Sequence, residues 1–129
     1  MSNANPSEPK RRILITDDDP SVRHMLARIL LDEGYETISA ADGEACLRIA
    51  ETTEVDLVLL DLKMTGISGE ETLKSLGASK PNLPVVVITA YPRPRHEIGR
   101  VSALLQKPLD FQALLETIKN LLIRKETHG

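Results

Sequence analysis

The chain has very few aromatic residues and a single cysteine. Tyr35, Tyr91 and Phe111 are its only aromatic side chains among 129 residues, and tryptophan is absent. Single-stranded nucleic acids are bound largely by stacking their bases on aromatic rings, so the composition argues against this function. Cys46 alone cannot form a disulfide or a thiolate zinc site within one chain. It falls inside a helical pattern, which predicts a buried structural thiol.

Long apolar runs and a strong excess of one charge are also missing. No uninterrupted apolar stretch is longer than Leu57 to Leu60, whereas a membrane-spanning helix needs about 20 residues. The polar residues 1–9 lack the apolar segment of a signal peptide. The 16 Lys and Arg residues against 19 Asp and Glu residues give a net charge of -3, which argues against binding to nucleic acids. These absences predict a cytoplasmic protein without membrane or nucleic-acid partners.

The hydrophobic pattern predicts one α/β domain. Short apolar strands are expected at 13–16, 35–40, 55–60, 85–89 and 103–106. Helical patterns follow at about 20–33, 43–51, 69–78 and 111–122, with Asp19, Asp42, Ser68 and Asp110 as N-caps. Strands and helices that alternate over short connections favour a parallel sheet covered on both faces. We expect a disordered tail over 1–10, the domain over 11–124 and a C-terminal tail over 125–129.

The predicted helices differ in quality. The first has an apolar face of Val22, Met25, Leu26, Ile29 and Leu30, and the last one of Leu114, Leu115, Ile118, Leu121 and Leu122. The stretch 92–102 contains Pro92, Pro94 and Gly99 and few apolar residues. Because proline lacks an amide donor and glycine weakens helices, we expect a shortened or irregular fourth helix there.

Polar residues stand where the predicted strands end. The strand ends carry Asp17, Asp18, Asp19, Asp61, Thr89 and Lys107. In open α/β sheets ligands bind at this edge. Clustered carboxylates repel one another unless protons or a cation relieve them, and nothing basic lies nearby in sequence, so Mg²⁺ suits the site. A carboxylate nucleophile, a metal, an ammonium and a hydroxyl are the components of phosphoryl transfer.

These motifs resemble those of the response regulator receiver domain of two-component signalling. The matching stretches are 13–20, 56–64, 87–90 and 106–109, and the resemblance covers about residues 11–124. It implies a flavodoxin-like, doubly wound sheet of five parallel strands in the order 2-1-3-4-5, like that of the chemotaxis regulators.

The resemblance also implies a role for each matching residue. Asp61 is expected to be the phosphoacceptor, which takes a phosphoryl group from a sensor histidine kinase. Asp18 and Asp61 are expected to ligate Mg²⁺, together with the Lys63 backbone carbonyl, while Asp17 acts through water. Thr89 is expected to bind the phosphoryl oxygens.

Lys107 is expected to pair with the phosphate, and the Lys107–Pro108 peptide bond to be cis. The chain departs from the family pattern in four places. Leu104 stands at the usual aromatic switch position, Thr65 replaces the proline of Met-Pro-Gly, and Leu109 replaces the phenylalanine of Lys-Pro-Phe. The interval from Thr89 to Lys107 is about one helical turn short.

The resemblance implies a signalling protein that assists its own phosphorylation and dephosphorylation. Because the sequence ends with the last helix and a short tail, we expect it to act by binding a downstream protein or by passing phosphate to a histidine phosphotransfer protein. One alternative is a pseudo-receiver that binds partners without phosphorylation, against which the intact site argues. Another is a small aspartate-nucleophile phosphatase, which would need an acidic residue at Lys63.

Overall fold

The computed structural model describes residues 10–63, 69–90 and 101–128, with side chains as far as residue 123. Its elements are β1 (Arg12–Thr16), α1 (Pro20–Asp32), β2 (Glu36–Ala40), α2 (Gly43–Thr52), β3 (Leu57–Asp61), α3 (Gly69–Ser79), β4 (Val85–Thr89), β5 (Ala103–Gln106) and α5 (Phe111–His128). All five strands are parallel, in the order β2-β1-β3-β4-β5. This confirms the predicted fold class. The expected irregular fourth helix falls mainly on residues 91–100, outside the described residues.

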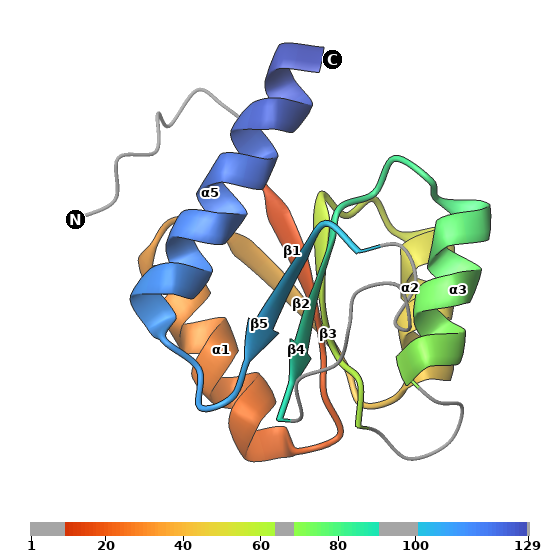
Figure 1. Ribbon diagram of the computed structural model, residues 1–129, viewed down its shortest axis with the longest axis horizontal. Coiled ribbons are helices and arrows are strands. Elements are labelled where there is room, and N and C mark those ends of the chain that lie inside the picture. Colours follow the sequence, from red (N-terminus) through yellow and green to blue (C-terminus); the bar gives the residue numbers. More distant parts are fainter. Residues whose placement is uncertain (1–9, 64–68, 91–100, 129) are drawn as a thin grey trace.

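Helices cover both faces of the sheet, with α1 and α5 on one side and α2 and α3 on the other (Figure 1). Successive strand residues point to opposite faces, so each face has its own apolar core. The core under α1 and α5 includes Ile13, Ile15, Leu26, Leu30, Leu57, Leu59, Leu114 and Ile118. The core under α2 and α3 includes Leu14, Cys46, Ala50, Val58, Leu60, Leu62, Leu73 and Leu76. The predicted burial of Cys46 is confirmed, and burial raises the pKa of its thiol.

Three of the predicted N-caps are confirmed. Asp19 accepts a hydrogen bond from the Ser21 amide, and Asp42 accepts one from the Ala45 amide. Asp110 accepts hydrogen bonds from two amides in the first turn of α5. The fourth predicted cap, Ser68, lies outside the described residues.

The apolar face predicted for the first helix is partly wrong. Leu26 and Leu30 are buried as expected, but Met25 is 41% exposed. Consecutive helical residues are separated by about 100° around the axis. Met25 therefore stands at the edge of the stripe that faces the sheet, and its side chain is only partly covered.

The last helix is longer than expected. α5 runs to His128, past the predicted domain boundary at residue 124 and into the stretch predicted as a tail. Arg, Lys and Glu at 124–126 are good helix formers, so the backbone continues as helix beyond Leu122, the last buried residue among those whose side chains are described. Within the described ranges, none of the helices has the length and apolar character that crossing a membrane requires.

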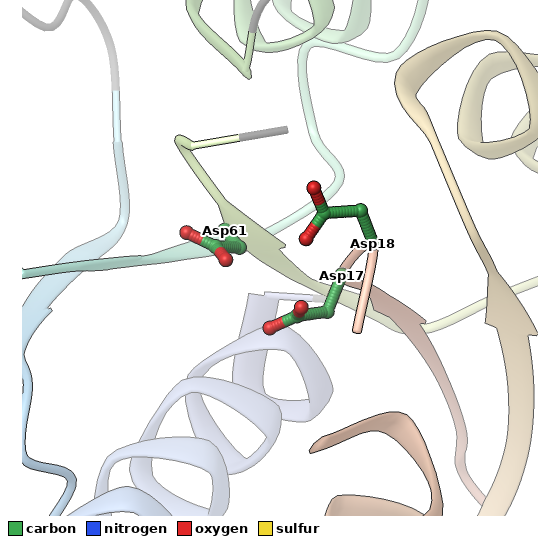
Figure 2. Close-up of side chains that lie close together, drawn as sticks. All are labelled: Asp17, Asp18 and Asp61. Atoms are coloured by element: carbon green, nitrogen blue, oxygen red, sulfur yellow. The ribbon is translucent and has the colours of Figure 1, made fainter. Parts of the chain in front are cut away.

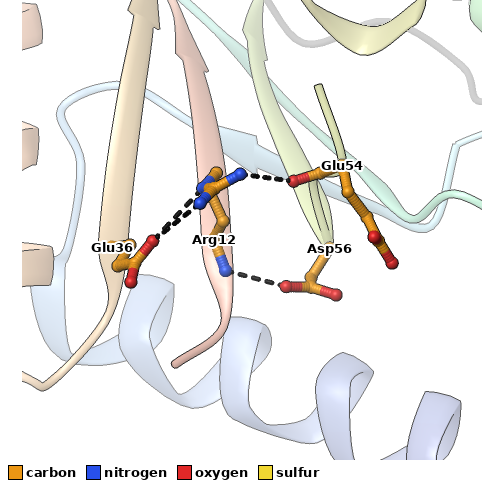
Figure 3. Close-up of polar contacts among 4 residues, drawn as sticks. All are labelled: Arg12, Glu36, Glu54 and Asp56. Atoms are coloured by element: carbon orange, nitrogen blue, oxygen red, sulfur yellow. Dashed lines mark hydrogen bonds and ion pairs between the residues drawn. The ribbon is translucent and has the colours of Figure 1, made fainter. Parts of the chain in front are cut away.

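Arg12 joins three strands at the amino end of the sheet (Figure 3). Its guanidinium donates to Glu36 Oε1 at 3.0 and 3.2 Å and to the Glu54 carbonyl at 3.1 Å. Its backbone amide donates to Asp56 Oδ2 at 2.8 Å, while the Asp56 amide donates to the Arg12 carbonyl. The Arg12 amide donates to a side-chain oxygen and so is not available to a backbone carbonyl of the neighbouring strand. The regular pairing of β3 with β1 therefore begins at Leu57 rather than at the predicted Val55.

Candidate functional site

The carboxyl edge of the sheet carries an open cavity of about 220 Å³. Its lining comprises Asp17, Asp18, Asp19, Val22, Asp61, Lys63, Thr89, Ala90 and Lys107. All six residues singled out for the predicted site, Asp17, Asp18, Asp61, Lys63, Thr89 and Lys107, are therefore brought together. They come from segments up to 90 positions apart in the sequence, from Asp17 to Lys107. The parallel topology places the ends of β1, β3 and β4 and the residue after β5 at this single edge.

Three carboxylates converge in this cavity (Figure 2). Asp17, Asp18 and Asp61 each offer an oxygen, and these atoms all lie within 4.8 Å of one another. Asp17 and Asp61 are both 4% exposed, whereas Asp18 is exposed. Two buried acids and one solvent-facing acid therefore form a cluster with an open side.

The Asp61 carboxylate is held through both of its oxygens. Oδ1 accepts a hydrogen bond from the Lys63 amide at 3.1 Å. Oδ2 accepts one from the Lys107 ammonium at 3.2 Å, and this ion pair spans β3 and the end of β5. The Lys107 side chain is 35% exposed, so its ammonium borders the open cavity.

The segment that carries Lys107 continues the sheet. The Lys107 amide donates to the Thr89 carbonyl at 2.8 Å, one residue beyond β5. Thr89, the last residue of β4, is buried and also lines the cavity. The Lys107–Pro108 peptide bond is cis, as the family resemblance implied.

The surroundings of Asp17 shift the pKa of its carboxyl. Burial raises the pKa of the Asp17 carboxyl above its ordinary value of 3.8, and the Asp61 carboxylate raises it further. A hydrogen bond from the Asp19 amide to Oδ1, at 2.9 Å, and the Lys107 ammonium act in the opposite direction. A negative charge on Asp17 beside the Asp61 carboxylate is therefore unfavourable in the folded chain, and a proton or a cation would relieve the repulsion.

Sequence reasoning missed one basic residue beside the cluster. The Arg23 guanidinium donates to the Asp17 backbone carbonyl at 2.7 Å. The expectation concerned neighbours in sequence, and it did not anticipate that the fold brings Arg23 against the Asp17 backbone. Arg23 follows Asp17 by six residues and reaches back from the first turns of α1, a spacing that could have suggested this contact.

The donor set fits a hard divalent cation. Mg²⁺ prefers oxygen ligands and binds through one or two carboxylates, keeping its other positions for water and phosphate oxygens. Asp17, Asp18 and Asp61 supply the carboxylates, and the cavity leaves room for a further oxyanion. An acidic cluster, a buried hydroxyl and an ammonium therefore meet at one edge of the sheet, and these are the kinds of group that phosphoryl transfer uses.

The chain belongs to the response regulator receiver domain family, whose model matches residues 13–119. It is 34% identical over 116 residues to sporulation initiation phosphotransferase F of Bacillus subtilis, an alignment that covers 86% of this chain and 93% of that protein. It is 31% identical to the transcriptional regulatory protein GlrR of Escherichia coli over 90% of this chain, but spans only 27% of GlrR. The chain is thus a signalling receiver domain.

Solved structures show the same fold. A receiver domain protein of Methanospirillum hungatei superposes with a TM-score of 0.88 at 31% identity, covering 94% of this chain and 100% of that one. The response regulator TrrA of Thermotoga maritima, solved in complex with Mg²⁺-BeF, gives a TM-score of 0.81 at 34% identity, with 86% and 98% covered. TrrA has also been solved with the histidine kinase ThkA, and that structure gives 0.81 at 35% identity, with 87% and 98% covered.

Proposed function

We propose that Asp61 is the phosphoacceptor of a two-component phosphorelay. The observation that carries the proposal is the placement of its buried carboxylate between the Lys107 ammonium, 3.2 Å away, and the acidic oxygens of Asp17 and Asp18. The phosphoryl donor is phosphohistidine on a sensor histidine kinase or on a histidine phosphotransfer protein. The cytoplasm is the compartment proposed for this reaction, because the kinase forms its phosphohistidine from ATP.

In the proposed reaction an Asp61 oxygen forms a bond to phosphorus as the bond from phosphorus to the histidine nitrogen breaks. The nitrogen keeps the electron pair of that bond. The Lys63 amide orients the carboxylate through Oδ1. Lys107, whose ammonium borders the cavity, turns from Asp61 to the phosphoryl oxygens, and the Thr89 hydroxyl donates a hydrogen bond to them.

Asp18 and Asp61 are proposed as direct ligands of Mg²⁺, with the Lys63 backbone carbonyl, and Asp17 as a ligand through water. When bound, Mg²⁺ supplies positive charge against both the carboxylates and the incoming phosphoryl oxygens. The same residues are proposed to support dephosphorylation, so the domain assists both reactions on its own Asp61. Its output is altered binding to a downstream protein or return of the phosphoryl group to a histidine.

Replacing Asp61 by asparagine tests this function. We expect acetyl phosphate with Mg²⁺ to add one phosphoryl group, of about 80 Da, to the wild-type chain and none to Asp61→Asn, because an amide is not a nucleophile. Intact-mass spectrometry gives the readout, and EDTA is expected to prevent labelling of the wild type. A wild-type chain that stays unlabelled would favour the pseudo-receiver, and labelling of Asp61→Asn would place the acceptor elsewhere.

Lys63 is expected to lengthen the life of the phosphorylated state. Its side chain is exposed and lines the cavity, and a protonated lysine cannot act as a base toward an attacking water. We expect Lys63→Asn to lose its phosphoryl group several-fold faster than the wild type. Lys74→Asn, which removes the same charge from the exposed side of α3, is the control. Equal decay rates for all three proteins would contradict shielding by Lys63. Tyr91 follows Thr89 by two residues, as Lys63 follows Asp61, and we expect it to shield the other side of the site; it lies outside the described residues.

A further inference from the structure

Gly69 begins α3 at a point where the helix touches the backbone that follows the proposed phosphoacceptor. A Cβ atom at residue 69 would lie 2.6 Å from the carbonyl oxygen of Leu62, 2.8 Å from its carbonyl carbon and closer still to its Cα. Real Cβ atoms essentially never approach other atoms this closely. The opposing atoms are backbone atoms, so no side-chain rotation can relieve the contact.

Both segments in this contact, Leu62 and α3, are held in place by other interactions. The Leu62 amide donates to the Ile88 carbonyl of β4, and the Leu62 side chain is buried in the core under α2 and α3. On the other side, Leu73 and Leu76 anchor α3 in the same core, at 2% and 1% exposure. Any added atom at residue 69 must therefore push on the segment Leu62–Lys63, on α3, or on both.

We infer that Gly69 is a positioning residue for the phosphoryl-acceptor site. Its missing side chain lets α3 press against Leu62 and so fixes the next residue, Lys63, whose amide donates to Asp61 Oδ1. The same short segment carries the backbone carbonyl proposed as a metal ligand. Gly69 touches neither metal nor phosphate, and acts through Leu62 and Lys63. The inference rests on the proposed function.

The chain offers a matched control on the same helix. A Cβ atom at Gly77 would meet nothing within 4 Å. Gly77→Ala therefore makes the same chemical change in α3 without a steric conflict, and it is expected to raise the melting temperature by a few degrees because alanine favours helix.

The test compares Gly69→Ala and Gly77→Ala with the wild type at a temperature where all are folded. We expect Gly69→Ala to bind Mg²⁺ roughly tenfold more weakly by calorimetry, as changes behind metal ligands commonly do. We also expect it to shift the NMR signal of the Lys63 amide and to slow labelling by acetyl phosphate. Gly77→Ala should leave all three unchanged. A Gly69→Ala protein with a lower melting temperature but normal Mg²⁺ affinity and a normal Lys63 signal would overturn the inference.

Two further measurements keep the test decisive if Gly69→Ala does not fold. The substitution can be made in the Gly77→Ala background, which adds stability. In the wild type, Mg²⁺ binding should slow amide exchange at Lys63 and also at Leu73, one turn after Gly69, because the two segments are in contact. Slower exchange at Lys63 alone would overturn the inference. A wild-type chain that binds no Mg²⁺ and accepts no phosphoryl group would instead overturn the proposed function.

Discussion

Replacing Asp18 by asparagine is expected to abolish Mg²⁺ binding and phosphorylation, whereas the same change at the neighbouring Asp19 is expected to preserve both. The Asp18 carboxylate lies within 4.8 Å of ligand oxygens on Asp17 and Asp61. Asp19 lines the same cavity, but its Oδ1 accepts a hydrogen bond from the Ser21 amide and caps α1. Asparagine caps helices as well as aspartate does, so Asp19→Asn keeps this contact.

Comparing the two variants distinguishes the loss of a direct Mg²⁺ ligand from a long-range effect of charge on Mg²⁺ binding. Both remove one negative charge from the same run of three aspartates, so a long-range effect of charge would weaken Mg²⁺ binding equally in both. A direct ligand is lost only in Asp18→Asn.

Thermal unfolding with and without Mg²⁺ measures the difference between these variants. A ligand at about 100 times its Kd stabilises the folded state by ~2.7 kcal/mol, a rise in melting temperature on the order of 10 °C for a domain of this size. We expect that rise for the wild type and Asp19→Asn, and none for Asp18→Asn. An equal rise in all three proteins would remove Asp18 from the metal site.

Much of this site could be predicted because its residues stand at strand ends. Val85–Thr89 is a β-branched run and Ala103–Gln106 is a shorter run with a weaker signal, and both strands occur where the pattern placed them. Once strands are parallel and joined by helices, their carboxyl ends must meet at one edge. The convergence of Asp17, Asp61 and Lys107 follows from that rule.

Other features depend on packing that no local pattern encodes. The exposure of Met25 is decided by how α1 lies on the sheet. The contact of Arg23 with the Asp17 carbonyl depends on the orientation of the same helix. The close approach of Gly69 to Leu62 depends on where α3 begins relative to β3, a tertiary distance. Sequence periodicity gives the face of a helix, but not its position to within a few ångströms.

The acidic cluster is expected to reduce the stability of the metal-free protein near neutral pH, and Asp17→Asn is expected to restore it. Asp17 is 4% exposed, and burial, followed by the Asp61 carboxylate, raises the pKa of its carboxyl above 3.8. Each pKa unit of such a shift corresponds to ~1.36 kcal/mol of unfavourable ionisation in the folded state. Asparagine removes this charge, can still accept the Asp19 amide hydrogen bond and can donate one to Asp61.

The sign of the pH dependence follows from the direction of the shift. Because the folded state holds the Asp17 proton more tightly than the unfolded chain, the wild type loses stability as pH rises from 3.8 through the higher folded pKa. Above that pKa the loss is complete, and below 3.8 it disappears. The stability advantage of Asp17→Asn should therefore be largest near pH 7 and should shrink as pH falls toward 3.8.

Urea unfolding of both proteins in EDTA, at several pH values, measures this advantage. The difference between the two free energies of unfolding cancels the titration of the other carboxylates, provided they behave alike in both proteins. Asp17→Asn should also bind Mg²⁺ more weakly, since the charge that destabilises the empty site is the charge that attracts the cation. A difference that is zero at pH 7, or that grows as pH falls, would show that the buried charge of Asp17 carries no cost in the folded protein.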